Sequence, residues 1–136
     1  MGVVIVTVVV VVLAALVVLR RRYVVARVWG HSMSPTFHDG ERVVATRRRH
    51  YRVGDVIVFR PRAATTDVVW RIKRIAAVAG DPVPAWLETD HPVVPAGRVV
   101  VVGDNTGHSE DSRQLGYIDT ARVAGAVPHR PAPEGS

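Results

Sequence analysis

Residues 71–81, RIKRIAAVAGD, form a short β-type run that ends at a turn, Gly80-Asp81-Pro82. The run contains Lys73, the single lysine of a chain that has seventeen arginines. Of these two residue types only lysine can lose its proton, because the arginine guanidinium stays charged in proteins. Strand alternation over 68–78 places Lys73 on one face with Val69 and Ile75. Apolar surroundings lower a lysine pKa, so the run predicts a strand that presents a candidate general base.

The amino-terminal segment is a candidate membrane anchor. Residues 3–19, VVIVTVVVVVLAALVVL, carry no charge, and Thr7 is their only polar side chain. A helix of this length spans about 26 Å, slightly short of a ~30 Å hydrocarbon core, and flanking arginines can cover the difference. A cleaved signal peptide is a weaker alternative because no basic region precedes the run. A buried core strand of this length is weaker still. We expect residues 1–22 to be a transmembrane anchor with a basic flank.

The flanking charge bears on the orientation of this anchor. Arg20, Arg21 and Arg22 follow the apolar run, and only the amino terminus precedes it. The positive-inside rule would therefore place the carboxyl-terminal domain in the cytoplasm. This expectation conflicts with the location that the motifs below imply.

Composition limits the other possibilities. The formal net charge is +6, and the absence of cysteine excludes disulfides and thiolate metal sites. Residues 47–52, RRRHYR, are the best local candidate for a nucleic-acid contact. A solvated turn or a patch facing anionic lipid is favoured, because no nucleic-acid fold signature accompanies the cluster. The six histidines are scattered without ligand spacing, so no metal site and no cofactor are expected.

Short β-type runs separated by turns predict a small, mostly β domain over residues 23–128. The expected strands are 42–46, 55–60, 68–78, 98–102, 117–118 and 122–127. Residues 20–29 are expected to be a juxtamembrane stretch, and the proline-rich residues 82–97 and the polar residues 103–116 are expected to be loops. Residues 129–136 are expected to be a disordered tail.

A base needs a nucleophile, and Ser32 in the loop GHSMSPT, residues 30–36, is the candidate. A serine hydroxyl attacks poorly until a neighbour removes its proton, and a neutral lysine can do this. A serine in such a loop is on its own most often a turn residue. The pairing of Ser32 with Lys73 therefore depends on the other motifs.

Four motifs occur in one order: SMSPT at 32–36, GDVIVF at 54–59, RIKRIAAVAGD at 71–81 and GDNTGHSEDSR at 103–113. In order and approximate spacing they resemble the sequence boxes of type I signal peptidases, over about residues 30–116. An anchor just before the serine box is also the arrangement of that family. The resemblance implies a signal-peptidase-like β domain on one amino-terminal transmembrane helix.

The resemblance also implies a role for each matched residue. Ser32 would be the acylating nucleophile and Lys73 the general base, so arginine at position 73 would abolish the reaction. The backbone N–H of Ser32 would be one oxyanion donor. Some relatives add a hydroxyl at the position of Gly30, and here that donor is absent. Ser109 would hydrogen-bond the lysine and orient it.

The remaining matched residues would support the site. Asp111 and Arg113 would form an acid–base pair with Ser112 beside them, and Gly103, Asp104 and Asn105 would shape the loop that returns to the lysine. Met33 would pack under the site near the bilayer, and Pro35 and Thr36 would hold the shape of the serine loop.

The implied function is a membrane-bound serine endopeptidase that removes signal peptides from secretory precursors beside small side chains. The precursor would bind as an extended peptide against a strand edge, without a cofactor. The expected partners are this precursor and membrane lipid, with the secretion translocon as a further candidate, and no nucleic acid. The expected location is the cell membrane, with a single pass and the catalytic domain outside the cytoplasm.

One departure from the family pattern leaves alternatives open. The proline-rich residues 82–97 stand where the family usually has a longer hairpin region, which puts the usual extended domain in question. A maturation peptidase dedicated to one precursor is one alternative. A non-catalytic membrane adaptor with the same fold is another, and a basic membrane-bound nucleic-acid binder is a third.

Overall fold

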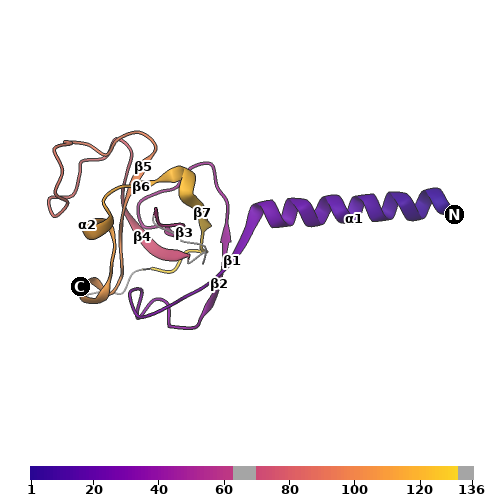
Figure 1. The fold of residues 1–136 in the computed structure, drawn as a ribbon, viewed down its shortest axis with the longest axis horizontal. Helices are drawn as coiled ribbons and strands as arrows, with labels where there is room; N and C mark the ends of the chain where they lie inside the picture. Colours follow the sequence, from indigo (N-terminus) through magenta and orange to yellow (C-terminus); the bar gives the residue numbers. More distant parts are fainter. Residues whose placement is uncertain (63–69, 132–136) are drawn as a thin grey trace.

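A single long helix, α1, carries the apolar segment away from the rest of the molecule (Figure 1). It spans Gly2–Arg22, and none of its residues is buried. Thr7 Oγ1 donates to the Val3 carbonyl at 2.8 Å, so the one polar side chain of the run is satisfied within the helix. The most apolar 18-residue window of the helix has a mean hydropathy of 3.4, and the helix is long and apolar enough to cross a membrane. Its bounds coincide with the segment that the sequence predicts as an anchor.

The structure, a computed structural model, describes residues 1–62 and 70–131. Beyond α1 the described residues form one antiparallel sheet with the strand order β1-β2-β7-β3-β4-β5-β6. The strands are β1 (Tyr23–Arg27), β2 (Arg42–Thr46), β3 (Val56–Phe59), β4 (Arg71–Val78), β5 (Arg98–Val102), β6 (Ile118–Asp119) and β7 (Val123–Ala126). The connections contain α2 (Ser112–Leu115) and two short 3₁₀ helices, η1 (Thr106–His108) and η2 (Thr120–Arg122). The predicted mostly β domain on one apolar helix is confirmed.

The predicted strands agree with the sheet except at its amino-terminal edge. The predictions 42–46 and 98–102 coincide with β2 and β5, and β3, β6 and β7 lie within one residue of their predicted bounds. Of the predicted strand 68–78, Val68 and Val69 lie outside the described residues. The predicted juxtamembrane stretch contains a strand that was not predicted, β1, which pairs with β2 from Tyr23↔Thr46 to Arg27↔Arg42. The partner of β1 is distant in sequence, so local pattern does not reveal the pairing.

The core fixes the loop that carries Ser32. Val28 before this serine and Met33 and Phe37 after it are buried, with Met33 1% and Phe37 0% exposed. They share one apolar cluster with strand side chains, namely Ala26, Val43, Ala45, Val56, Val58 and Ile72, and with Val127. Burying a side chain of this size stabilises by roughly 1.5–3 kcal/mol. The backbone on both sides of Ser32 is therefore anchored in the core.

The carboxyl-terminal segment differs from the predicted disordered tail at Arg130. Its Nη1 lies 2.6 Å from Glu41 Oε1 and donates to the Thr36 carbonyl at 3.2 Å. Its guanidinium lies over the Phe37 ring, 4.5 Å from the centroid. The chain is thus tied to the serine loop at Arg130, and residues 132–136 lie outside the described residues.

Candidate active site

Ser32 and Lys73 meet in space although 41 residues separate them in the chain, with 2.7 Å between Ser32 Oγ and Lys73 Nζ. Lys73 lies in the third position of β4, opposite Ile57 of β3, and only 4% of its surface is exposed. A proton can pass directly between two groups at this distance. The structure therefore brings the predicted nucleophile and the predicted base into contact.

Burial is the main reason why the pKa of Lys73 falls from 10.5 to about 8. The nearby charge of Arg71 lowers this pKa further, whereas Asp111 and Glu110 act in the opposite direction. At pH 7 an amine with a pKa of about 8 is roughly 10% neutral, compared with about 0.03% for an amine that titrates at 10.5. The site thus makes neutral lysine about 300-fold more abundant.

The peptide group of Ser32 is held by the loop that follows β5. Asn105 N–H donates to the Ser32 carbonyl at 2.9 Å, and Asn105 Nδ2 donates to the His31 carbonyl at 3.0 Å. The Ser32 N–H has no acceptor among the described residues, so it can donate to an oxyanion. Gly30 has φ 77°, and its N–H donates to Asp39 Oδ1 at 2.8 Å. The predicted single oxyanion donor is compatible with this geometry.

The predicted pair of Asp111 and Arg113 forms. Arg113 Nε donates to Asp111 Oδ1, and Arg113 Nη2 donates to Asp111 Oδ2, both at 2.9 Å. Burial raises the pKa of the Asp111 carboxyl, but hydrogen bonds from Arg113 and from the Gly103 N–H outweigh it and hold this pKa below its usual value. Ser112 Oγ accepts from the Val101 N–H at 2.8 Å. These bonds tie the 103–113 loop to β5.

Ser109 lies against Gly103 and does not form the predicted hydrogen bond with Lys73. Its Oγ is buried beside the Asp111 carboxyl, whose pKa it helps to lower, and Lys73 Nζ bonds to Ser32. A Cβ atom at Gly103 would lie 2.0 Å from Ser109 Oγ and 2.7 Å from the Ser32 carbonyl oxygen. The bare backbone of Gly103 therefore lets the two serines approach the same point of the loop.

A buried ion pair that the sequence analysis missed connects β4 to this loop. Arg74 Nε and Nη2 donate to the two Asp104 oxygens, each at 2.8 Å, and Arg74 Nη1 donates to the Gly54 carbonyl at 2.8 Å. Thr36 Oγ1 donates to Asp104 Oδ2 at 2.5 Å, which joins the serine loop to the pair. Burial raises the pKa of Asp104, but the bonds from Arg74 and Thr36 outweigh it and lower this pKa. The sequence signal that could have revealed this pair is an arginine on an otherwise apolar strand face, because a buried arginine needs a buried partner.

The other predicted loop residues also lie in this framework. Met33 Sδ accepts from the Asp104 N–H at 3.5 Å, and the peptide bond between Ser34 and Pro35 is cis. Met33 is buried in the domain core, and its predicted position near the bilayer stays a prediction.

Comparison with known proteins gives the family. The model of the family described as "Signal peptidase, peptidase S26" matches residues 1–89 and 83–130. The chain belongs to the peptidase S26 family.

Three similar proteins show how far the similarity extends. A mitochondrial ATP-independent inner membrane protease subunit 1b of Arabidopsis thaliana is 33% identical over 76% of this chain and 66% of its own length. Signal peptidase I of Bacillus licheniformis is 31% identical over 72% of this chain and 70% of its own length. The mitochondrial inner membrane protease subunit 2 of Danio rerio is 35% identical over 77% of this chain and 62% of its own length. The chain therefore spans about two thirds of the length of these relatives.

A solved structure was also found. The crystal structure of a signal peptidase I from Enterococcus faecalis V583 matches with a TM-score of 0.43 and 19% identity, over 57% of this chain and 97% of that chain.

In this S26 family member Ser32 and Lys73 line a cleft of about 390 Å³. Its lining residues come from the segment between β1 and the serine loop, from the start of β4 and from the 103–113 loop. The lining residues beyond the pair itself are Val28, Trp29, Gly30, His31, Met33, Trp70, Arg71, Ile72, His108 and Glu110. Within this lining, Arg71 Nη1 lies 3.1 Å from Glu110 Oε2. The sequence analysis did not predict this ion pair, since its two residues belong to different motifs.

The sheet leaves strand edges free beside this cleft. On its β5 side, the pairing of β4 begins only at Arg74↔Val102, so residues 71–73 have no described strand partner there. β1 pairs with β2 alone among the described strands. Within the same residues, no group of three or more His, Asp or Glu side chains could hold a metal ion.

Proposed function

We propose that this chain is a membrane-anchored serine endopeptidase that removes signal peptides from secretory precursors. The observation that carries the proposal is the contact of 2.7 Å between Ser32 Oγ and Lys73 Nζ inside the cleft. Membership of a peptidase family and the similarity to a signal peptidase I and to inner membrane proteases support the reaction class.

The acylation step uses Lys73 in its neutral form. The Ser32 hydroxyl donates its hydrogen bond to the amine lone pair and transfers its proton as Oγ attacks the scissile carbonyl carbon. The negative charge that develops on the carbonyl oxygen is stabilised by the Ser32 N–H, which has no acceptor in the described structure. As the C–N bond breaks, the Lys73 ammonium returns the proton to the leaving amine. The product of this step is an ester on Ser32.

Deacylation reverses these roles with water as the nucleophile. Neutral Lys73 takes a proton from water, and the hydroxyl oxygen attacks the ester carbonyl. Collapse of the second tetrahedral intermediate releases the new carboxylate, and Ser32 Oγ regains its proton. Lys73 therefore cycles between neutral and charged forms twice in each turnover, which a pKa of about 8 allows near neutral pH.

The precursor binds as an extended segment between the two free strand edges beside the cleft. Main-chain groups of residues 71–73 on the β5 side are the proposed partners of its backbone. Apolar cleft residues, including Val28 and Ile72, limit the size of the side chains next to the scissile bond. A preference for small residues at the cleavage site would follow from this limited space.

The membrane fixes where the reaction occurs. α1 is long and apolar enough to hold the domain at the bilayer, and we propose a single span with the catalytic domain on the outer side, where precursors emerge. The arginines at the end of the span favour the opposite orientation, so the side of the membrane is to be measured by protease protection in sealed vesicles.

The test uses the full chain in liposomes and a precursor with an Ala-x-Ala site. Wild type, Ser32→Ala and Ser34→Ala are compared, because Ser34 is a second hydroxyl of the same loop that does not contact Lys73. We expect wild type and Ser34→Ala to release a product whose mass places the cut after the second alanine. Ser32→Ala should release none. Cleavage by Ser32→Ala would refute the proposal.

A peptidase dedicated to one precursor is the second candidate. The observation that favours it is the short 82–97 segment, which closes on itself through the bridge Pro82↔Val93 and the bond from Val94 N–H to the Asp81 carbonyl at 2.9 Å. A wild type that ignores general precursors but reacts at Ser32 with an acylating probe would favour this candidate.

A further inference from the structure

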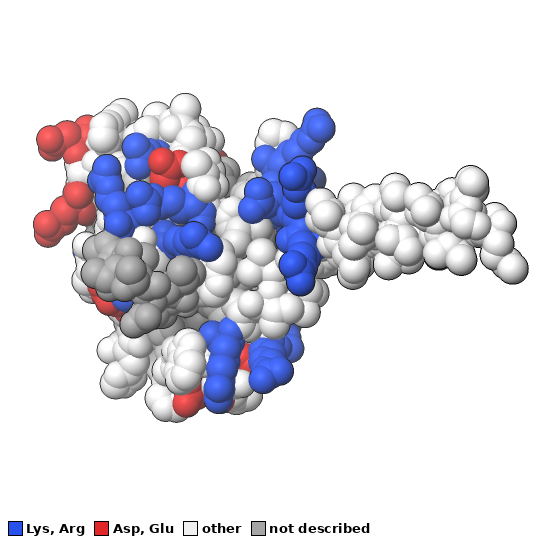
Figure 2. All heavy atoms as spheres, turned by 45° about the vertical axis from the view of Figure 1, so that its right-hand side comes forward, with Lys and Arg blue, Asp and Glu red and all other residues white. Residues whose placement is uncertain are grey.

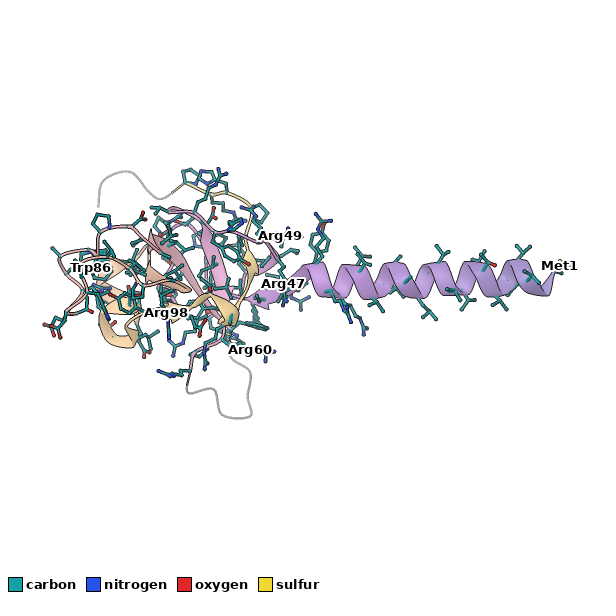
Figure 3. All side chains as sticks on the ribbon, turned by 90° about the horizontal axis from the view of Figure 1, so that it is seen from above. Met1, Arg47, Arg49, Arg60, Trp86 and Arg98 are labelled. Carbon is teal, nitrogen blue, oxygen red and sulfur yellow. The ribbon has the colours of Figure 1, made fainter. Side chains whose placement is uncertain are left out.

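Two arginine triplets lie side by side where α1 meets the sheet. Arg20, Arg21 and Arg22 end the helix, and Arg47, Arg48 and Arg49 follow β2. We name these six arginines the basic collar. The backbone fixes their proximity, because the Arg47 N–H donates to the Arg22 carbonyl at 2.9 Å. Figure 2 shows basic side chains gathered at this junction, and Figure 3 places Arg47 and Arg49 at the helix end of the domain.

Few carboxylates neutralise the positive charge of the basic collar. Only Arg48 has a carboxylate partner among the described residues, Asp55 at 3.8 Å, and 46% of that arginine side chain remains exposed. The other five arginines form no ion pair with a described carboxylate, and α1 contains no acidic residue. Like charges so close together repel one another. The surface therefore favours an anionic ligand.

Two hollows adjoin the basic collar and share Arg47. The larger, about 580 Å³, lies between residues 47–51 and strand ends of the sheet, where Arg98 adds a further guanidinium. The smaller, about 310 Å³, is lined by Val18, Arg21, Arg22 and Arg47. Val18 belongs to the apolar span of α1. The smaller hollow thus joins three guanidinium groups to a side chain that faces lipid in a membrane.

We propose that the basic collar binds the headgroup of an anionic phospholipid from the membrane that holds α1. The phosphate would lie against Arg22 and Arg47, whose planar guanidinium groups suit two-pronged hydrogen bonds to its oxygens. The acyl chain would continue along Val18. Free phosphate and nucleic acid share the charge of this ligand, but neither has an apolar part to place beside the span.

Lipid binding would also give the arginine triplets a function at the outer leaflet. Their charges would then be neutralised by headgroups and would hold the domain against the membrane surface. This binding would stabilise the outer orientation of the domain, although the positive-inside rule favours the opposite one. It does not depend on the proposed peptidase activity.

The test titrates the full chain in a neutral detergent with dihexanoyl phosphatidylglycerol, and with dihexanoyl phosphatidylcholine, inorganic phosphate and a short single-stranded DNA as comparison probes. Binding is measured by native mass spectrometry at fixed salt. The double variant Arg22→Gln/Arg47→Gln is compared with Arg42→Gln/Arg52→Gln, which removes two exposed charges that line neither hollow. Two lost contacts at about fivefold each predict an affinity about 25-fold weaker in the first variant. The control variant should stay within about threefold of wild type.

Three results would overturn the proposal. Equal losses in the two double variants would show that diffuse charge attracts the lipid. Competition by inorganic phosphate at the concentration at which phosphatidylglycerol binds would identify a site for free anions. Tighter binding of DNA than of phosphatidylglycerol would identify a nucleic-acid surface.

Discussion

Lys73→Met should stabilise the folded domain while abolishing the proposed activity. Methionine keeps a long unbranched side chain but has no charge to bury. Lys73 is 4% exposed, and burial lowers its pKa from 10.5 to about 8. The interval between these two values corresponds to about 3 kcal/mol, at roughly 1.4 kcal/mol for each pH unit. This is the cost of keeping the lysine protonated in the folded protein at pH 7.

The sign of this effect with pH follows from proton binding. The unfolded chain holds the proton of Lys73 more tightly than the folded chain, because the pKa is lower in the folded state. The cost is fully present below about pH 8 and is lost as the pH rises towards 10.5. The variant should therefore be more stable than wild type by about 3 kcal/mol at pH 7 and by much less near pH 10.5.

Urea unfolding of the full chain in neutral detergent, followed by tryptophan fluorescence, measures this difference. Trp29, Trp70 and Trp86 are the only tryptophans and all lie outside α1, so their signal reports the domain. Other ionisable groups titrate in both proteins, and comparison at each pH removes their contribution. A variant less stable than wild type at pH 7 would refute the argument. So would a stability difference that stays constant between pH 7 and pH 10.

Three further predictions concern the site and its supports. The kcat/KM of precursor cleavage should rise with pH and level off above about 8, because neutral Lys73 is the reactive form; a pH-independent profile would exclude it as the base. Gly103→Ala should lower kcat by about 100-fold because its Cβ would displace the Ser32 carbonyl, whereas Gly107→Ala, which meets nothing within 4 Å, should keep wild-type rates. Asp104→Asn should lower the free energy of unfolding by about 3–5 kcal/mol because it leaves the charge of Arg74 buried without a partner, and a loss below about 1 kcal/mol would contradict this.

Much of the fold was predictable because its signals are local. The uncharged run of α1 and the short runs of β2 and β5 can each be recognised within their own residues. β1 could not be, because its five residues become a strand only through pairing with β2 across the serine loop. The four-residue helix α2 was also missed, although its start is local: the Asp111 side chain accepts from the Arg113 N–H, and the Asp111 N–H donates to Gln114 Oε1.

The site shows the same difference between local signals, which the sequence reveals, and long-range contacts, which it does not. Ser32 and Lys73 were found because one is embedded in a recognisable loop motif and the other is the only lysine. Their contact needs the packing of Met33 and Phe37, which no local pattern specifies. The predicted bond from Ser109 to the lysine failed because a hydroxyl can point to several neighbours, and sequence does not choose among them.

The most direct test of the Ser32–Lys73 pair is the rate of precursor cleavage by Lys73→Arg beside wild type. Arginine keeps the positive charge but cannot give up its proton near neutral pH. Tryptophan fluorescence would first establish that the variant is folded. If neutral Lys73 is the base, Lys73→Arg should cleave no faster than Ser32→Ala between pH 7 and pH 9. Cleavage within about tenfold of wild type would mean that charge alone suffices and that another group removes the proton from Ser32.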